Sequence, residues 1–422
     1  MRLRNIVLIV ITTFLLPEVY DGYTIYTPGG GFGGNSSTTY LKDADWNTVN
    51  TWNHSCGAAS MPYLVLTDEL GIENSLLYYP CRSNPTIMDS GGVGGQIKIY
   101  DWDGNELWSM VIAGIVSAAN TSNELQHHHD IEPLDNGNIL FVTYERKTYT
   151  EAITMGRENI DNEIWPTMII ELEQTGLHSS EIVWEWHLWD HTIQDINSNL
   201  DNYGIISEHP ELLDIDLGTL GGGGGSSGDW IHTNSIDYNE NLDILVISSR
   251  KMNEFYFIDH STTSQEASSH SGGNYNRGGD ILYRWGNPQN YQRGNSQNQI
   301  LISQHSVNWI ADGYPGEGNI ILFNNRTEEV GSEVLELAIP YYESFLINED
   351  EIFLPQEPLW NYSEGSFFSN VQSGAFRLKN GNTLISIGSD ATFFEIDSLG
   401  DLLWEYTFQG PSGQEFNGNI PR

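Results

Sequence analysis

The stretch HDIEPLDNGNILFV, residues 129–142, decides the fold of this chain. Two short apolar runs flank a turn of Asp, Asn and Gly, a pattern that is typical of a β-hairpin. The pattern returns in HTNSIDYNENLDILVI from residue 232, HSVNWIADGYPGEGNIILF from residue 305 and SGAFRLKNGNTLISI from residue 373. After each hairpin come a third apolar strand and a fourth that carries a tryptophan. The sequence therefore predicts an all-β protein built from a repeated four-stranded unit.

Two more units complete the series. MPYLVL, SLLYY, QIKIYD and ELW form a fifth, and YTIYT, TTYLKD and NTVNTW near the N-terminus supply three strands of a sixth. The tail after Trp404 supplies the missing strand, because sharing one blade between the termini is how a β-propeller closes its ring. We expect a single domain over residues 23–422, a six-bladed β-propeller with four-stranded blades at 23–52 plus the tail, 61–108, 129–186, 232–285, 305–360 and 373–406. Its tryptophans are expected to pack between blades.

The register of the hairpins predicts which residues meet in the central channel. Aligning the turns places His129, His232, His305 and Ser373 at equivalent positions at the start of an inner strand, each seven residues before a turn-side Asn or Asp. We name this end of the channel the histidine end and the other the turn end. Three histidines from consecutive blades are therefore expected to converge at the histidine end.

Arginines and long connections are predicted at the same end. Because the strands of a hairpin are antiparallel, Arg250, at the end of LDILVISSR, returns to His232, and Arg146 is a weaker candidate in the preceding blade. His127 and His128 are assigned to a connecting loop. Long loops on one face of a rigid scaffold commonly carry function, and four long connections are expected here: 109–128, 144–166, 187–231 and 286–304.

Such a cluster has three interpretations. Each histidine can cap its own strand through backbone hydrogen bonds, the three can bind zinc or another transition metal, or they can form an anion site together with Arg250. The permanent positive charge of Arg250 disfavours a metal dication and suits an oxyanion. We therefore expect an anion-binding site without a metal.

The overall charge narrows the classes of partner. The chain has 57 acidic and 17 basic residues, a formal net charge of -40 at pH 7. Proteins that bind nucleic acid or anionic membranes present basic surfaces instead, so neither partner is expected. An anionic small molecule needs a local positive pocket in such a protein, and the histidine end with Arg250 is the place where the sequence provides one.

The N-terminus predicts export. Arg2 and Arg4 precede the largely apolar run 6–16, which is typical of a signal peptide, here assigned to residues 1–22. No other stretch is apolar enough to cross a membrane, so no stable membrane insertion is expected. We expect a periplasmic, cell-surface or secreted protein. Cys56 and Cys81 then lie in an oxidising compartment, where a disulfide is expected, with two buried free thiols as the alternative.

Three segments that carry the histidines are specific enough to compare with a known family. QHHHDIEPLDNGNILFVTYE, DWIHTNSIDYN with the following ISSR, and QHSVNWI resemble the aryl-sulfate sulfotransferase family, which consists of exported six-bladed propeller enzymes. The likeness runs from about residue 23 to the C-terminus. It implies transfer of a sulfuryl group from an aryl sulfate to a phenolic acceptor through a sulfohistidine, without a sulfonucleotide donor, a metal or another cofactor. It also implies that His305 is the nucleophile, with His129, His232 and Arg250 as the other catalytic residues.

Sulfuryl transfer requires the same residue types, a nucleophile and positioned cations. A neutral imidazole is a competent nucleophile near neutral pH, and positioned cations stabilise the charge that spreads over the sulfuryl oxygens. His232 or His129 is expected to protonate the departing phenolate. The substrate-binding candidates are Trp230, Asn234, Trp309 and Tyr314, with plain packing as the alternative for the aromatic residues. The competing functions are a hydrolase that uses the same site, a metal-dependent lyase, and a non-catalytic surface or adhesive propeller. The sequence predicts no oligomeric state.

Overall fold

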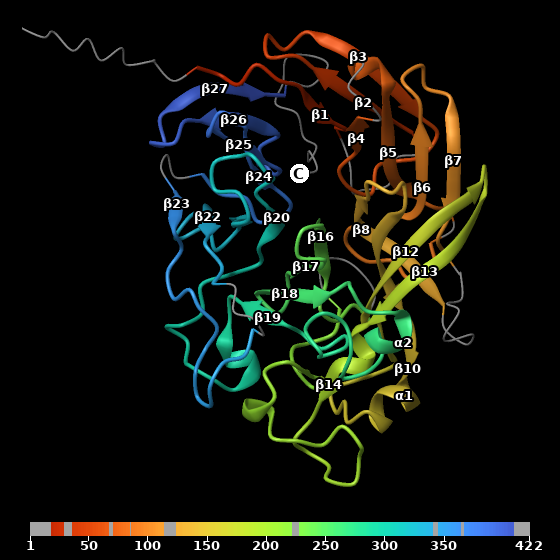
Figure 1. The fold of residues 1–422 in the computed structure, drawn as a ribbon, viewed down its shortest axis with the longest axis vertical. Coiled ribbons are helices and arrows are strands. Elements are labelled where there is room, and N and C mark those ends of the chain that lie inside the picture. The colour runs from red at the N-terminus through yellow and green to blue at the C-terminus, as the bar shows by residue number, and fades with distance from the viewer. Residues whose placement is uncertain are drawn as a thin grey trace, which may run out of the picture.

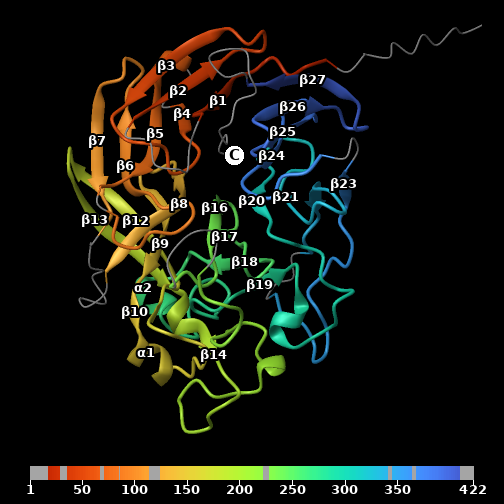
Figure 2. The same ribbon diagram turned by 180° about the vertical axis from the view of Figure 1, so that it is seen from behind.

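Among the described residues, six antiparallel sheets of three or four strands are arranged around a central axis, an all-β six-bladed β-propeller (Figure 1, and from behind in Figure 2). The computed structural model describes residues 18–28, 36–66, 71–84, 86–113, 124–221, 228–340, 345–363 and 367–408. The repeated hairpins are the reason for this architecture, since each unit leaves an apolar face that only its neighbours can cover. The predicted six-bladed propeller is therefore confirmed.

The sheets follow one another along the chain. Blade one contains β1 (Thr24–Tyr26), β2 (Ser37–Lys42) and β3 (Thr48–His54), and blade two contains β4 (Tyr63–Leu66), β5 (Ser75–Arg82), β6 (Gly95–Tyr100) and β7 (Glu106–Val111). Blade three contains β8 (Leu125–Pro133), β9 (Ile139–Glu145), β12 (Thr167–Gly176) and β13 (Ser179–His187), and blade four β16 (Thr233–Asn239), β17 (Ile244–Ser249), β18 (Glu254–Asp259) and β19 (Tyr283–Trp285). Blade five contains β20 (His305–Trp309), β21 (Ile320–Asn324), β22 (Glu333–Leu337) and β23 (Trp360–Tyr362), and blade six β24 (Gly374–Arg377), β25 (Thr383–Ile387), β26 (Thr392–Ile396) and β27 (Leu402–Thr407).

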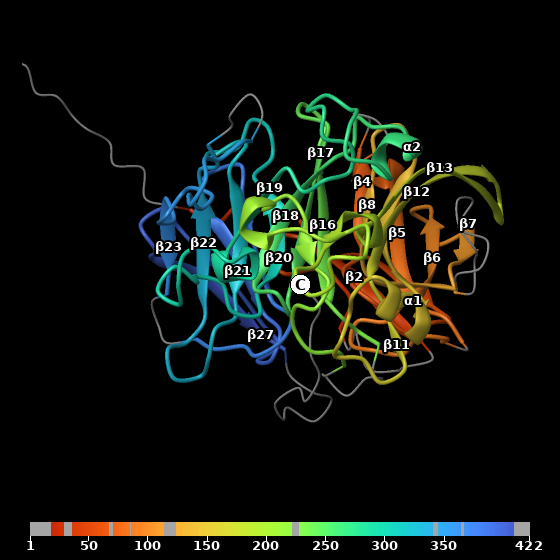
Figure 3. The ribbon, with the colours of Figure 1, turned by 90° about the horizontal axis from the view of Figure 1, so that it is seen from below.

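Short elements occupy the connections. Two single-turn helices, α1 (Tyr149–Thr154) and α2 (Ser264–Ala267), each begin at a Thr-x-x-Glu capping box, which satisfies the first backbone N–H groups of the helix. Seen from below, α1 and α2 lie at opposite ends of the strands (Figure 3). The remaining elements are η1 (Ile72–Asn74), η2 (Leu188–His191), η3 (Ile206–Glu208), η4 (Pro288–Tyr291), and the strand pairs β10 (Lys147–Thr148) with β11 (Glu163–Ile164) and β14 (Thr192–Ile193) with β15 (Leu213–Asp214).

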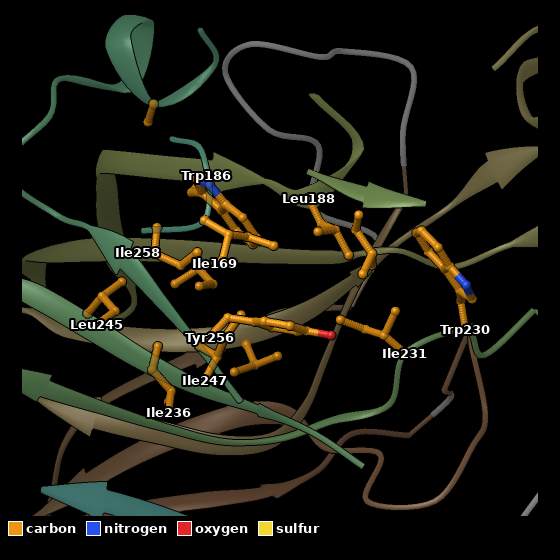
Figure 4. Packing of buried hydrophobic residues seen from close by; sticks show 14 of the residues in the cluster. Ile169, Trp186, Leu188, Trp230, Ile231, Ile236, Leu245, Ile247, Tyr256 and Ile258 are labelled. Atoms are coloured by element: carbon orange, nitrogen blue, oxygen red, sulfur yellow. The ribbon is translucent and has the colours of Figure 1, made fainter. Parts of the chain in front are cut away.

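The core lies between neighbouring blades. Trp186 of β13 is fully buried and packs with Ile169 of blade three and with Tyr256 and Ile258 of blade four (Figure 4). Large aromatic side chains bury more apolar area per residue than other side chains and therefore dominate the energetics of a core. This cluster agrees with the prediction that the tryptophans pack between blades. The inner strands β8, β16 and β20 lie next to one another around the channel (Figure 1).

The two ends of the described chain meet at blades one and six. Phe408 packs edge-on against Tyr26 of β1, with ring centroids 4.8 Å apart, and β27 already completes blade six as its fourth strand. Blade one has three strands among the described residues. The strand expected from the tail falls on residues 409–422, and most of the predicted signal peptide on residues 1–17, both outside the described residues. Sharing of a blade stays a prediction.

The two cysteines are bridged. Cys56 and Cys81 form a disulfide with their Cα atoms 5.9 Å apart, joining the segment after β3 to β5. The expected disulfide is therefore confirmed. Within the ranges that the structure describes, no helix has the length and apolar character needed to cross a membrane.

Candidate active site

Two of the predicted histidines meet at the histidine end. His129 and His232 adopt φ values of 55° and 54°, in the left-handed region that side chains other than glycine rarely take. The pairing of β8 with β9 breaks between His127 and Ile131, so that His129 lies within a β-bulge. The imidazole rings of His129 and His232 pack edge to face with centroids 4.6 Å apart. Local backbone strain thus turns the two side chains toward each other.

A buried carboxylate orients His232. Nδ1 of His232 lies 2.6 Å from Oδ2 of Asp229, and the same oxygen accepts a hydrogen bond from Ser90 Oγ at 2.9 Å. Burial alone would raise the pKa of Asp229, but the charge and hydrogen bond of His232 outweigh it and lower the pKa to about 2. Asp229 is therefore ionised, Nδ1 of His232 donates to it, and Nε2 is left to exchange a proton. Asp229 lies three residues before His232 in DWIH, but the hairpin pattern does not mark it as a site residue.

The connection between β5 and β6 closes over these two rings. The backbone N–H of His129 donates to the carbonyl oxygen of Gly92 at 2.6 Å. A Cβ atom on Gly92, where φ is 72°, would lie 2.2 Å from Nε2 of His129, and one on Gly91 would lie 3.2 Å from Cε1 of His232. Only glycine permits such close approach of backbone to both rings. Blade two therefore contributes a wall of the site that the hairpin register did not predict.

Arg250 lies where the antiparallel hairpin predicted it. Its backbone N–H donates to the carbonyl oxygen of His232 at 3.2 Å, and the residue is half-buried. Burial lowers the pKa of Arg250 from a very high value while the charge of Asp229 raises it, so the guanidinium keeps its charge. Arg146 differs, because it forms ion pairs with Glu124 and Glu163. Its charge is thereby neutralised, and Arg250 is the better candidate for an anion.

His305 is held on the neighbouring inner strand by neutral partners. Its Nδ1 lies 2.7 Å from Oδ1 of Asn325, and its Nε2 accepts a hydrogen bond from the backbone N–H of Gln372 at 3.2 Å. Because the amide oxygen only accepts and the N–H only donates, these contacts select the neutral imidazole with its proton on Nδ1. The lone pair of Nε2 is then the nucleophilic position.

Gln304 ties His305 to the strands of blade four. Nδ2 of Asn234 donates to the carbonyl oxygen of Gln304 at 2.8 Å, and Nε2 of Gln304 donates to the carbonyl oxygen of Ser249 at 3.0 Å. Ser249 precedes Arg250, and His305 follows Gln304. Asn234 is fully buried and joins β16 to the segment that carries His305, while its role as a substrate ligand stays a prediction.

The alignment of the inner strands needs one correction. The backbone N–H of Ile236 donates to Asp130 of the preceding blade, and the N–H of Val307 donates to Ser235 in the same way. Asp130 and Ser235 are therefore equivalent, which makes Asn234 the counterpart of His129. His232 lies two residues earlier, because β16 extends closer to its turn than the other inner strands. The side chain of His232 still reaches His129 from that position.

The assignment of His127 and His128 to a loop is wrong. Both belong to β8 and are buried, and burial lowers the pKa of His127 to about 3 and that of His128 well below its usual value. His128 stacks on Tyr144 at 3.7 Å, and its Nδ1 lies 2.7 Å from Nδ1 of His129. A simple alternation of side chains failed to predict this contact, since the bulge interrupts it. His128 forms the inner wall behind His129.

The aromatic candidates do not gather at the histidine end. Trp230 is fully buried in the core cluster of Figure 4, and its indole N–H donates to the carbonyl oxygen of Leu217 at 2.8 Å. Tyr314 lies in the connection from β20 to β21, which is at the turn end. Tyr314 therefore lies away from the histidine end, and its role as a substrate ligand stays a prediction. The burial of Trp230 favours the packing alternative.

Trp309 borders a different space. It ends β20 and lines a cavity of about 250 Å³ that Asp130, Glu132 and Asp237 also line. Burial raises the pKa of Asp237 to about 7 and that of Glu132 well above its usual value. The residues that line this cavity include no Lys, Arg or His, so they offer a sulfate ester no positive partner. The placement gives no support to Trp309 as a ring-stacking partner.

A family model covers most of this chain. The model of the arylsulfotransferase (ASST) family matches residues 94–402, well over half of the chain. The chain belongs to the arylsulfotransferase family, and the resemblance drawn from the three histidine segments is confirmed. Family membership implies a sulfotransferase enzyme that uses aryl sulfate substrates.

Several solved structures are similar to this chain at low identity. A protein of unknown function from Bacteroides caccae is 12% identical, with 90% of this chain and 92% of that chain covered and a TM-score of 0.45. A virginiamycin B lyase from Staphylococcus aureus is 10% identical, with 93% of this chain and 90% of that chain covered and a TM-score of 0.36. A putative 6-phosphogluconolactonase from Bacteroides fragilis is 10% identical, with 92% of this chain and 94% of that chain covered and a TM-score of 0.40. No curated protein matches the chain.

Proposed function

We propose that the protein transfers a sulfuryl group from an aryl sulfate ester to a phenolic acceptor in two steps, through a sulfohistidine at His305. The observation that carries this proposal is the division of labour among the histidines. His305 is held neutral with a lone pair on Nε2, whereas His232 rests on an ionised aspartate beside His129 and Arg250. A nucleophile and an acid/base are the two groups that such a transfer requires.

The first step forms a bond between Nε2 of His305 and the sulfur atom and breaks the bond from sulfur to the aryl oxygen. His232, protonated on both nitrogens with Nδ1 directed at Asp229, gives its Nε2 proton to the departing phenolate. Arg250 binds the sulfuryl oxygens, where the charge of the transition state develops. The hydrogen bond from the Gln372 N–H to Nε2 of His305 is given up when the new bond forms.

The second step reverses the chemistry with a new phenol. Neutral His232 takes the proton of the acceptor, the acceptor oxygen attacks sulfur, and the bond between sulfur and His305 breaks. The imidazole of His305 is regenerated and no cofactor is consumed. Splitting one transfer into two replaces a difficult step by two easier ones.

We also propose that the enzyme works in an exported, oxidising compartment. The Cys56–Cys81 disulfide supports this placement, because such bonds persist outside reducing compartments. The basic and apolar N-terminal run supports it independently.

The experiment is an assay with p-nitrophenyl sulfate as donor and phenol as acceptor. We expect nitrophenol release together with phenyl sulfate formation, and a fall in turnover of at least about 10⁴-fold in His305→Ala, since that variant lacks the attacking group. Without acceptor, mass spectrometry should find one sulfuryl group on the peptide that contains His305. The control is His178→Ala. His178 lies in the turn between β12 and β13, and its side chain forms a hydrogen bond with Ser109 of β7.

Each alternative predicts a different result. Sulfate released at the same rate with or without phenol would identify a hydrolase. Turnover that a chelator abolishes would indicate a metal-dependent lyase or hydrolase. A folded protein that releases no nitrophenol would contradict the proposal and favour a non-catalytic propeller.

A further inference from the structure

A second cluster of ionisable side chains lies on the outer part of the propeller, where blades three and four meet. His191 ends η2 directly after β13, and His270 and Asp280 come from the connection between β18 and β19. Their ligand atoms lie within 4.8 Å of one another. None of the three belongs to an inner strand, and the proposed transfer uses none of them. Figure 1 shows α2, which begins this connection, beside β13.

The hydrogen bonds of His191 leave one of its nitrogens facing a negative charge. Nε2 lies 2.8 Å from the carbonyl oxygen of Ala267, which only accepts, so Nε2 carries the proton. In a neutral ring Nδ1 then has a lone pair, yet it lies 2.8 Å from Oδ1 of Asp280. A lone pair and a carboxylate oxygen repel each other at this distance. A cation between them, either a second proton or a metal ion, resolves the conflict.

A third donor converges on the same oxygen. Nδ1 of His270 lies 2.7 Å from Oδ1 of Asp280, so that two imidazole nitrogens flank one carboxylate oxygen. A tetrahedral zinc ion with bonds of 2.0–2.1 Å keeps its ligand atoms about 3.3 Å apart. The observed separations of 2.7 and 2.8 Å, with a largest value of 4.8 Å, bracket that spacing. Small side-chain rotations therefore bring all three atoms to zinc distance.

The surroundings fix His191 as a ligand requires. The bond from Nε2 to a backbone carbonyl is the outer-shell contact that sets the tautomer of most metal-binding histidines. The ring stacks on Trp186 with an interplanar angle of 2°, and the indole N–H of Trp186 donates to Gly279 at 2.7 Å. A Cβ atom on Gly279 would lie 2.5 Å from Nε2 of His191. His191 and Asp280 are buried, whereas the side chain of His270 is 63% exposed and leaves a path for entry.

Two charged side chains, Arg277 and Glu211, lie near the cluster. Arg277 interacts with Asp280 and with Glu211, which adds one positive and one negative group to the surroundings. Glu211 bonds to His209 at 2.9 Å. Two imidazoles and one carboxylate, with one position open to solvent, form a donor set that suits zinc better than calcium or magnesium, which prefer oxygen ligands.

We propose that His191, His270 and Asp280 bind one zinc ion, which clamps the segment after β13 to the β18–β19 connection. The ion joins elements of two blades through side chains that lie far apart in the sequence. It takes no part in sulfuryl transfer. Its expected effect is on the stability of the junction between blades three and four, because a ligand that binds only the native state stabilises it.

The test is titration of the untagged, chelator-treated protein with zinc chloride, followed by calorimetry and by thermal unfolding. We expect one ion per chain and a higher melting temperature with zinc, reversed by a chelator. His270→Ala should weaken zinc binding at least about 10-fold and lose the thermal shift. Since His270 is exposed, this variant is expected to fold. Asp280→Asn, which keeps the shape of the side chain, should do the same.

The matched control is His209→Ala, which removes a nearby, half-exposed histidine that also bonds to a carboxylate. It should bind zinc as the wild type does. The proposal is overturned if the protein binds no zinc. It is also overturned if His270→Ala binds zinc unchanged, or if His209→Ala loses it.

Discussion

The starts of the inner strands of blades four and five both present a histidine whose Nδ1 is held, yet by chemically different partners. In blade four the partner of His232 is the carboxylate of Asp229, and in blade five the partner of His305 is the amide of Asn325. A carboxylate stabilises the positively charged imidazole, whereas an amide oxygen stabilises the neutral one. This difference supports the proposed assignment of proton transfer to His232 and of nucleophilic attack to His305.

Two other buried histidines support this interpretation within the same fold. Burial would lower the pKa of His187, but hydrogen bonds and charge interactions, with Glu145 foremost, raise it to about 10. His127 is also buried. Burial lowers its pKa to about 3, and the opposing contribution comes from a backbone hydrogen bond and not from a side-chain carboxylate. A neighbouring carboxylate therefore decides the charge of a buried histidine here.

The largest effect is expected from Asp229→Asn, which gives His232 the kind of partner that His305 has. The variant removes the charge that supports an imidazolium, so turnover should fall by about 10²–10⁴-fold with little change in KM. Because Asp229 acts through His232, the loss should depend on the leaving group. The loss of kcat/KM for the donor, which in a two-step transfer reports only the first step, should be large for phenyl sulfate and small for p-nitrophenyl sulfate, whose phenolate departs without a proton. Steady-state kinetics with both donors measures this.

The control for that variant is Asp195→Asn, a change at an exposed aspartate in the same long connection, where Oδ2 bonds to Gln292. It should keep wild-type kinetics. An equal loss of donor kcat/KM for both sulfates in Asp229→Asn would contradict an acid role for His232 in the first step and indicate a purely structural role for the carboxylate.

A smaller effect, on stability, is expected at His187. Its folded-state pKa of about 10 lies above the unfolded value of about 6.5, so its contribution to the free energy of unfolding is complete below about pH 6.5. That contribution is lost as the pH rises through the folded value. The limiting slope for one proton is about 1.4 kcal/mol per pH unit. Denaturant unfolding between pH 7 and pH 9 should show this decline in the wild type.

His187→Gln should remove most of the decline, while His209→Gln, at a half-exposed histidine, should leave it in place. A wild-type stability that stays constant from pH 7 to pH 9 would show that the Glu145 carboxylate does not hold a proton on His187 in this range.

The smallest effect is expected from Tyr314→Ala. This residue lies at the turn end of the channel, while the compared histidines lie at the other. The variant should keep kcat/KM for p-nitrophenyl sulfate within about twofold, as changes away from functional groups generally do. A larger loss would place substrate at both ends of the channel and would weaken the assignment of the site to the histidine end.

The propeller could be predicted because its signals are local. An apolar run, an Asn/Asp/Gly turn and a second apolar run specify a hairpin from neighbouring residues, and the repeat then specifies the blades. Arg250 was placed for the same reason, since it ends the hairpin that His232 begins. The two-residue shift between His232 and the true counterpart of His129 was missed, because the turn alone does not report how far each strand extends.

The sequence by itself determined the all-β architecture, the number of blades and the family, and it proposed the residues that carry the chemistry. Only the tertiary structure decided which carboxylate faces which histidine. Asp229 and Ser90 lie 139 positions apart and meet through the packing of blades two and four, and a β-bulge turns His128 to the back of His129. Such contacts depend on bulges and loop closure, which are set by packing across blades rather than by the order of residues along one strand.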